Sequence, residues 1–136
     1  MSGPKPTLVL DFDGVCHSYV SGWQGIDQCP DPPVPGLFEF LAQAMQVFAV
    51  AIYSSRSAQR QGREAMMDWF MKAYGEWLPM PEGPEKAARV FGLIRDLAFP
   101  ESKPPAHVTL DDRALTFEGR WPALDELLAF QPWYRR

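Results

Sequence analysis

Three short apolar runs in the sequence each lead directly into a cluster of polar side chains. They cover residues 7–12 (TLVLDF), 47–53 (VFAVAIY) and 107–110 (HVTL). Continuous aliphatic and β-branched runs of this kind are typical of parallel strands buried on both faces. The carboxyl ends of such strands lie along one edge of an open sheet, where ligands bind. The runs therefore predict a parallel sheet whose carboxyl edge carries the polar chemistry of the chain.

Apolar residues at helical spacing lie between and after these runs. They predict helices over 37–45, 57–74 and 84–98, and a last helix that begins at Pro122. Ser57 is expected to cap the second helix and Gly75 to end it. Alternating strands and helices indicate βαβ units. We therefore expect an α/β protein with a three-layer Rossmann-like fold, a mostly parallel sheet and helices on both faces.

Two further strands have weaker patterns. Residues 114–117 predict a short edge strand, and a third inner strand fits either 78–80 or 99–103. The chain has 14 prolines in 136 residues, gathered in clusters that end helices and fix loops. The first cluster lies in the irregular stretch 16–36.

Length and charge narrow the class of protein. The 136 residues suit one domain over 1–136, and a net charge of −4 argues against binding nucleic acid by bulk charge. No apolar run approaches the roughly 20 residues of a membrane span, and the first residues lack a signal-peptide pattern. Cys16 and Cys29 have no metal-site spacing. We expect two reduced thiols in a cytoplasmic protein without membrane contact.

The polar clusters at the strand ends combine acids with hydroxyl groups. Asp11 and Asp13 follow the first run, Ser54 and Ser55 the second, and Asp111 with Asp112 the third. Four carboxylates in one place repel each other unless a cation neutralises them, and oxygen ligands favour a hard ion such as Mg²⁺. Such a metal, together with Lys103 and a hydroxyl, suits phosphoryl chemistry.

The same segments carry a family pattern. The stretches DFDGV at 11–15, IYSSR at 52–56 and KPPAHVTLDDR at 103–113 resemble the four ordered motifs of the haloacid dehalogenase superfamily of phosphohydrolases. The resemblance spans residues 7–121. It implies that Asp11 is the nucleophile that forms an aspartyl-phosphate.

The resemblance also implies the roles of the other motif residues. Asp13 would protonate the leaving oxygen and then activate water. Ser54, through its hydroxyl, and Ser55, through its backbone N–H, would bind the phosphoryl group. Lys103 would offset the negative charge of nucleophile and phosphate.

The metal ligands implied by the resemblance are four acids. Asp11, Asp13 through its carbonyl, Asp111 and Asp112 would hold Mg²⁺. The direct bond is assigned to Asp112 in preference to Asp111.

Several residues near the motifs have two interpretations each. Arg56 and Arg113 would bind a second phosphate of the substrate or form structural salt bridges. Trp23 would offer an aromatic surface to a base or would anchor its loop. His17 is expected to be incidental, and Cys16 to be packed.

Neither usual insertion point of the family has room for a cap domain. We therefore expect a capless protein in which the loop 16–36 is the local candidate for a flap. An open site suits a nucleotide-like substrate or a macromolecular end, and a neighbouring subunit of a homo-oligomer could close it.

These features predict a Mg²⁺-dependent phosphomonoesterase. A phosphotransferase and a non-hydrolytic phosphoacceptor or binding module remain alternatives, because both use the same residues.

Overall fold

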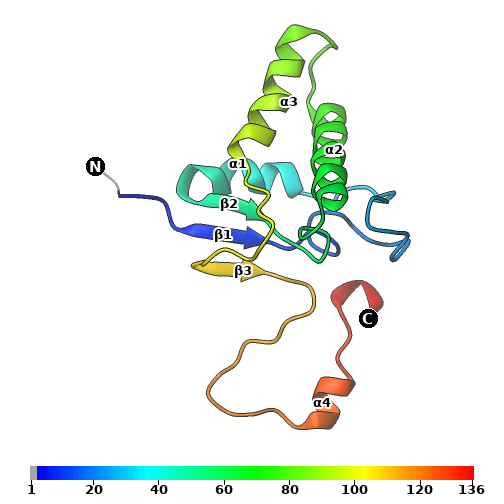
Figure 1. Cartoon of the computed structure of the whole chain (residues 1–136), viewed down its shortest axis with the longest axis vertical. Coiled ribbons are helices and arrows are strands. Elements are labelled where there is room, and N and C mark those ends of the chain that lie inside the picture. Colours follow the sequence, from blue (N-terminus) through cyan, green and yellow to red (C-terminus); the bar gives the residue numbers. More distant parts are fainter. Residues whose placement is uncertain (1–2) are drawn as a thin grey trace.

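The computed structural model describes residues 3–136 and shows an α/β protein built on a small parallel sheet (Figure 1). Strand β1 (Thr7–Leu10) lies in the centre between β2 (Ala49–Ile52) and β3 (Val108–Leu110). Leu10 pairs with Ile52 on one side and with Leu110 on the other. All three strands run in the same direction, so their carboxyl ends meet at one edge, as the sequence predicts.

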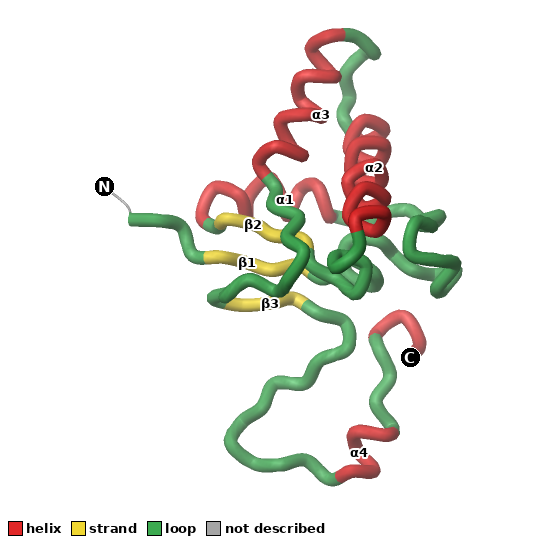
Figure 2. Tube along the Cα trace, in the orientation of Figure 1, coloured by secondary structure: helices red, strands yellow, loops and turns green. Residues whose placement is uncertain are grey.

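Two helices pack on the sheet through apolar stripes. Helix α1 (Leu37–Val47) and helix α2 (Arg60–Trp77) each bury residues at the spacing of one helix face. The buried residues of the two helices are Leu37, Phe38, Leu41, Ala44, Gly62, Met66, Trp69, Phe70 and Ala73. Helix α3 (Pro84–Asp96) packs on α2 and extends away from the sheet (Figure 2).

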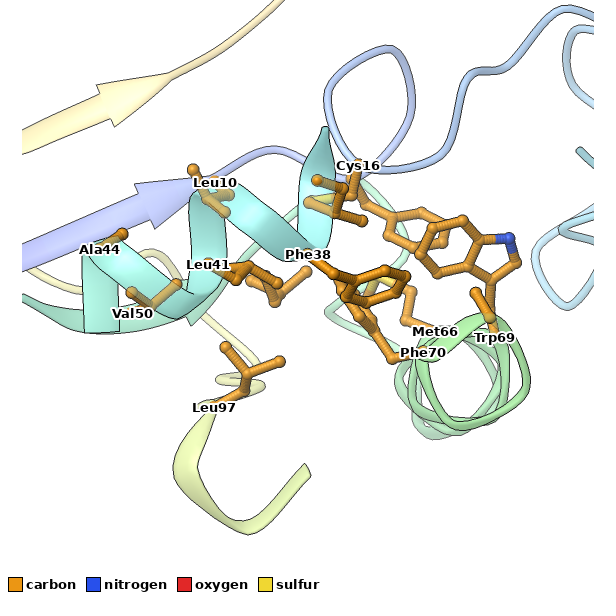
Figure 3. Packing of buried hydrophobic residues seen from close by; sticks show 14 of the residues in the cluster. Leu10, Cys16, Phe38, Leu41, Ala44, Val50, Met66, Trp69, Phe70 and Leu97 are labelled. Atoms are coloured by element: carbon orange, nitrogen blue, oxygen red, sulfur yellow. The ribbon is translucent and has the colours of Figure 1, made fainter. Parts of the chain in front are cut away.

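The core continues from β1 into the loop that follows it (Figure 3). The ring of Phe12 is completely buried, with its centroid 5.1 Å from that of Trp69 and 6.0 Å from that of Phe70. Burying an aromatic side chain of this size contributes about 2–3 kcal/mol. Packing of Phe12 in the core therefore fixes the position of the segment that begins at Asp11.

The chain crosses the sheet after α3. Ala98 forms a parallel bridge to Ala51 of β2, while β3 lies at the opposite edge. The segment between them must therefore pass over the sheet, as Figure 1 shows. This single bridge stands directly before 99–103, one of the two places where the sequence allows a third inner strand. A second layer of helices over this face stays a prediction.

The boundaries of α2 differ from the expected ones. The helix begins at Arg60, because the Ser57 hydroxyl accepts a hydrogen bond from the Ser54 N–H at 2.9 Å and so closes an earlier turn. It also continues past Gly75 to Trp77. Gly75 has helical neighbours on both sides and does not act as a stop.

The predicted edge strand at 114–117 was wrong. In the part of the chain that the structure describes, these residues pair with no strand, and Leu115 and Phe117 are more than half exposed. They begin an arm, residues 113–132, that swings away from the sheet (Figure 1). The arm contains only the five-residue helix α4 (Leu124–Leu128).

The arm returns to the sheet at its end. The 3₁₀ turn η1 (Trp133–Arg135) lies near the carboxyl edge (Figure 1). Among residues 3–136, no helix has the length and apolar character needed to cross a membrane.

Candidate functional site

A cavity of about 320 Å³ opens at the carboxyl edge of the sheet. It is lined by Val9, Asp11, Tyr53, Ser54, Ser55, Lys103, Thr109, Asp111, Asp112 and Arg113. All three strand-end clusters contribute to this lining, and the crossing segment adds Lys103. A larger hollow of about 1060 Å³ lies along the arm, but its lining combines apolar side chains with scattered charges. The chemistry of its lining, rather than its size, marks the smaller cavity as the candidate site.

Three carboxylates meet in this cavity. Asp11, Asp111 and Asp112 each offer an oxygen, and these oxygens lie within 4.8 Å of one another. Burial, a hydrogen bond with Asp112 and the charge of both neighbours raise the pKa of Asp11 to about 9. The cluster thus disfavours three negative charges at once, and a bound cation would relieve that repulsion.

The donor set fits a hard divalent cation. All three side chains offer carboxylate oxygens, the ligands preferred by Mg²⁺ and Ca²⁺. Groups of acids are common on protein surfaces. Here the distinguishing feature is a partly buried carboxyl group, Asp11, whose neighbours are both acidic.

Backbone and side-chain donors hold the carboxylates in place. The Phe12 N–H donates to Asp11 Oδ1 at 2.8 Å, and the Arg113 N–H donates to Asp111 Oδ1 at 2.8 Å. Asp112 Oδ2 accepts a hydrogen bond from the Tyr134 hydroxyl at 2.7 Å. Each acid is therefore oriented by a different segment.

Two serines and a lysine also line the cavity. Ser54 is buried at the end of β2, and its hydroxyl oxygen accepts a hydrogen bond from the Arg56 N–H at 3.0 Å. Ser55 and Lys103 are exposed, so both can reach a ligand in the cavity. The structure thus brings Asp11, Ser54 and Lys103 to one site.

Asp13 points to a different set of partners. Its carboxylate accepts hydrogen bonds from Arg56 Nε at 2.9 Å and from Arg56 Nη2 at 3.2 Å, and it lies 2.9 Å from His17 Nδ1. These two partners outweigh the effect of burial and hold the pKa of Asp13 below its usual range. The Asp13 carboxylate is not part of the three-acid cluster.

The sequence leaves open whether Arg56 binds a phosphate of the substrate or forms a structural salt bridge. In the structure it forms a buried salt bridge with Asp13. The side chain is completely buried, and Nη1 donates to the carbonyl oxygens of Gly25 and Ile26 at 2.8 Å. Its guanidinium carbon lies 4.6 Å from the ring centroid of Trp23. Trp23 and Arg56 therefore anchor the loop 16–36 to the loop that follows β1.

The sequence suggests that His17 is incidental, but in the structure its ring connects two parts of the loop region. Its Nε2 accepts a hydrogen bond from the Asp31 N–H at 2.9 Å. Nδ1 therefore carries the ring hydrogen and donates a hydrogen bond to Asp13. In the described part of the chain, loop 16–36 contributes no residue to the cavity lining.

Sequence reasoning missed Tyr134 and Trp133. Trp133 Nε1 donates to the carbonyl oxygen of Gly14 at 2.7 Å, beside the Tyr134 contact with Asp112. No motif or spacing in the sequence marks these two residues. Only the return of the arm brings them to the site.

Comparisons with known proteins do not identify a relative. No family model, curated protein or solved structure matches this chain. The function must therefore be argued from the site itself.

Proposed function

We propose that this protein is a Mg²⁺-dependent phosphomonoesterase that acts through an aspartyl-phosphate intermediate. The observation that carries the proposal is the single cavity in which Asp11 and two further acids face Ser54 and Lys103. The sequence resemblance to haloacid dehalogenase phosphohydrolases supports the same chemistry. We also propose that the fold is a three-layer arrangement with helices on both faces of the sheet.

In the first step, a carboxylate oxygen of Asp11 attacks the phosphorus atom of the ester. A P–O bond forms to Asp11 while the bond to the leaving oxygen breaks, and the leaving oxygen takes a proton from Asp13. Lys103 and the Ser54 hydroxyl would hold the phosphoryl oxygens.

In the second step, water attacks the phosphorus atom and gives a proton to Asp13. The bond from phosphorus to Asp11 breaks, which frees inorganic phosphate and restores the carboxylate. Arg56 holds Asp13 ionised, the state that can accept this proton. The acid step requires Asp13 to take up a proton beside the same arginine.

Asp11, Asp111 and Asp112 would hold the cation, with the Asp13 carbonyl as the further ligand implied by the resemblance. When bound, the cation would neutralise the carboxylates and offset charge on the phosphoryl oxygens.

The accessible cavity favours a nucleotide-like substrate or a phosphorylated macromolecular end. Arg113 is an exposed part of the lining and can meet a second anionic group of such a substrate. A neighbouring copy in a homo-oligomer would close the open side.

The test is hydrolysis of an aryl phosphate with Mg²⁺ by the Asp11→Asn variant. We expect hydrolysis to be abolished, while Asp27→Asn, an exposed aspartate outside this cavity, retains it. Unchanged turnover in Asp11→Asn would overturn the proposal. A stable phosphoprotein without phosphate release would favour a phosphoacceptor instead, and transfer to an added alcohol would favour a phosphotransferase.

A further inference from the structure

The turn η1 makes close contact with the candidate site. It donates two side-chain hydrogen bonds, from Trp133 Nε1 to the Gly14 carbonyl oxygen and from the Tyr134 hydroxyl to Asp112 Oδ2, both 2.7 Å long. The ring of Tyr134 also meets that of Tyr19 edge to face, with centroids 5.9 Å apart. The turn therefore touches both the loop after β1 and the acid pair after β3.

These contacts leave no room between the segments. Gly14 has φ of +83°, and a Cβ atom there would lie 2.6 Å from Tyr134 Cε1 and 2.7 Å from Asp112 Cγ. Three segments that are far apart in the sequence thus meet at van der Waals distance. Such packing restricts the orientation of the Asp112 side chain.

Asp112 differs from its neighbours in where its donor comes from. Asp11 and Asp111 are each held by a backbone N–H of their own segment. Besides its hydrogen bond with Asp11, Asp112 accepts one from a neutral phenol that comes from a distant turn. A neutral donor fixes one carboxylate oxygen and leaves the negative charge available, whereas an arginine would neutralise it.

We propose that Tyr134 is a positioning residue for the cation site. Its hydroxyl holds Asp112 Oδ2, so that Asp112 Oδ1 is presented together with Asp11 and Asp111 to the cation. The inference rests on the cation site of the proposed function. Partners of this kind orient metal-binding carboxylates, and their removal costs 10- to 100-fold in metal affinity or activity.

The experiment measures cation affinity directly. Tb³⁺ is the probe, because its luminescence is sensitised by nearby aromatic side chains, and Mg²⁺ is titrated as a competitor. Tyr134→Phe keeps the ring against Tyr19 and removes only the hydroxyl. We expect this variant to bind Mg²⁺ at least 10-fold more weakly than the unmodified chain. Tyr19→Phe is the matched control and should change the affinity less than 2-fold.

A double variant separates positioning from simple anchoring of the arm. In an Asp112→Asn background the hydroxyl has no carboxylate to orient, so adding Tyr134→Phe should alter Mg²⁺ affinity less than 2-fold. Equal effects of Tyr134→Phe in both backgrounds would overturn the inference. Unchanged affinity in the single variant would do the same, as would failure of the unmodified chain to bind Mg²⁺.

The outcome is distinct from that of the phosphatase assay. Weakened binding in Tyr134→Phe without any hydrolysis by the unmodified chain would support the positioning role and contradict the phosphatase. Hydrolysis by the unmodified chain, together with unchanged Mg²⁺ affinity in Tyr134→Phe, would support the phosphatase and contradict the positioning role.

Discussion

Arg56 and Asp13 form a two-pronged ion pair across 43 positions of sequence, with Nε 2.9 Å from Oδ2 and Nη2 3.2 Å from Oδ1. The arginine side chain is completely buried and the aspartate side chain is 14% exposed. The pair links the end of β2 to the loop after β1. It thereby fixes the loop that carries Asp11 and Asp13 relative to Ser54 and Ser55.

Arg56→Met should destabilise the protein strongly. Removal of the arginine leaves the Asp13 charge without its ion-pair partner, with only His17 as a donor, and leaves two carbonyl oxygens unpaired. Breaking a buried pair in this way costs about 3–5 kcal/mol. The free energy of unfolding from urea denaturation measures the effect. The control is Arg60→Met, because Arg60 pairs with Glu64 on the exposed surface and should cost less than about 0.5 kcal/mol. Equal losses in the two variants would contradict the structural role of Arg56.

Two glycines of α2 should respond in opposite ways to alanine. A Cβ atom at Gly62 would overlap the carbonyl oxygen of Arg56, so Gly62→Ala should cost about 1–3 kcal/mol. A Cβ atom at Gly75 would meet only Val90 and Lys86, at 3.8 and 3.9 Å. Gly75→Ala should therefore raise the free energy of unfolding by about 0.5–1 kcal/mol, because alanine favours the helix. Thermal unfolding of both variants measures the difference, and stabilisation by Gly62→Ala would exclude the close approach.

The acid cluster predicts a pH-dependent stability in the absence of divalent ions. The pKa of Asp11 rises to about 9 from an ordinary value of 3.8, so between these values the folded protein holds a proton that the unfolded chain has lost. The contribution of Asp11 to the free energy of unfolding should therefore fall as the pH rises from about 4 to about 9.

Urea denaturation at pH 5 and pH 8 with a chelator measures this effect. Relative to Asp11→Asn, which has no proton to lose at this position, the unmodified chain should become less stable between pH 5 and pH 8. Added Mg²⁺ should restore the stability of the unmodified chain most at pH 8, because the ion then competes with fewer protons. A difference that does not change with pH would contradict the repulsion between the carboxylates.

Both cysteines should react slowly with a thiol reagent. They are free, Cys16 is completely buried, and burial raises the pKa of its thiol. Partial burial raises the pKa of Cys29 to about 11. Since the thiolate is the reactive form, the colorimetric disulfide reagent DTNB at pH 8 should label the native protein slowly and the urea-unfolded protein at once. Rapid labelling of Cys16 in the native protein would show that the loop 16–36 opens.

The strands and the acids could be predicted because both depend on local pattern. A continuous apolar run such as 7–12 has few options other than a buried strand, and its polar residues then fall at the sheet edge. Lys103 was expected at the site because of its place in the family motif, eight residues before Asp111, and it lines the cavity. The start of α2 was predicted three residues too early, because Ser57 caps the turn at Ser54 instead of the helix.

The missed contacts are partly local, as His17 with Asp13 and Ser57 with Ser54, and partly long-range. The sequence leaves open whether Arg56 binds a phosphate or forms a structural salt bridge, and it does not single out Asp13 as the partner. Nothing near Tyr134 reveals that it reaches Asp112. The first pairing depends on the neighbouring positions of β1 and β2, and the second on how the arm 113–132 returns to the sheet. Residues 114–117 were expected to form a short edge strand, but within residues 3–136 they pair with no strand.

The central position of β1 has a consequence for the order of folding. Leu8 pairs with Val50 on one side and with Val108 on the other. The first strand of the chain can therefore pair only with strands that lie much further along the sequence. The Trp133–Gly14 contact spans 119 positions. Contacts of such long range slow folding, because distant segments must meet before any stability is gained. The Trp133–Gly14 contact should therefore form only in the last kinetic phase of refolding, after the helices have formed.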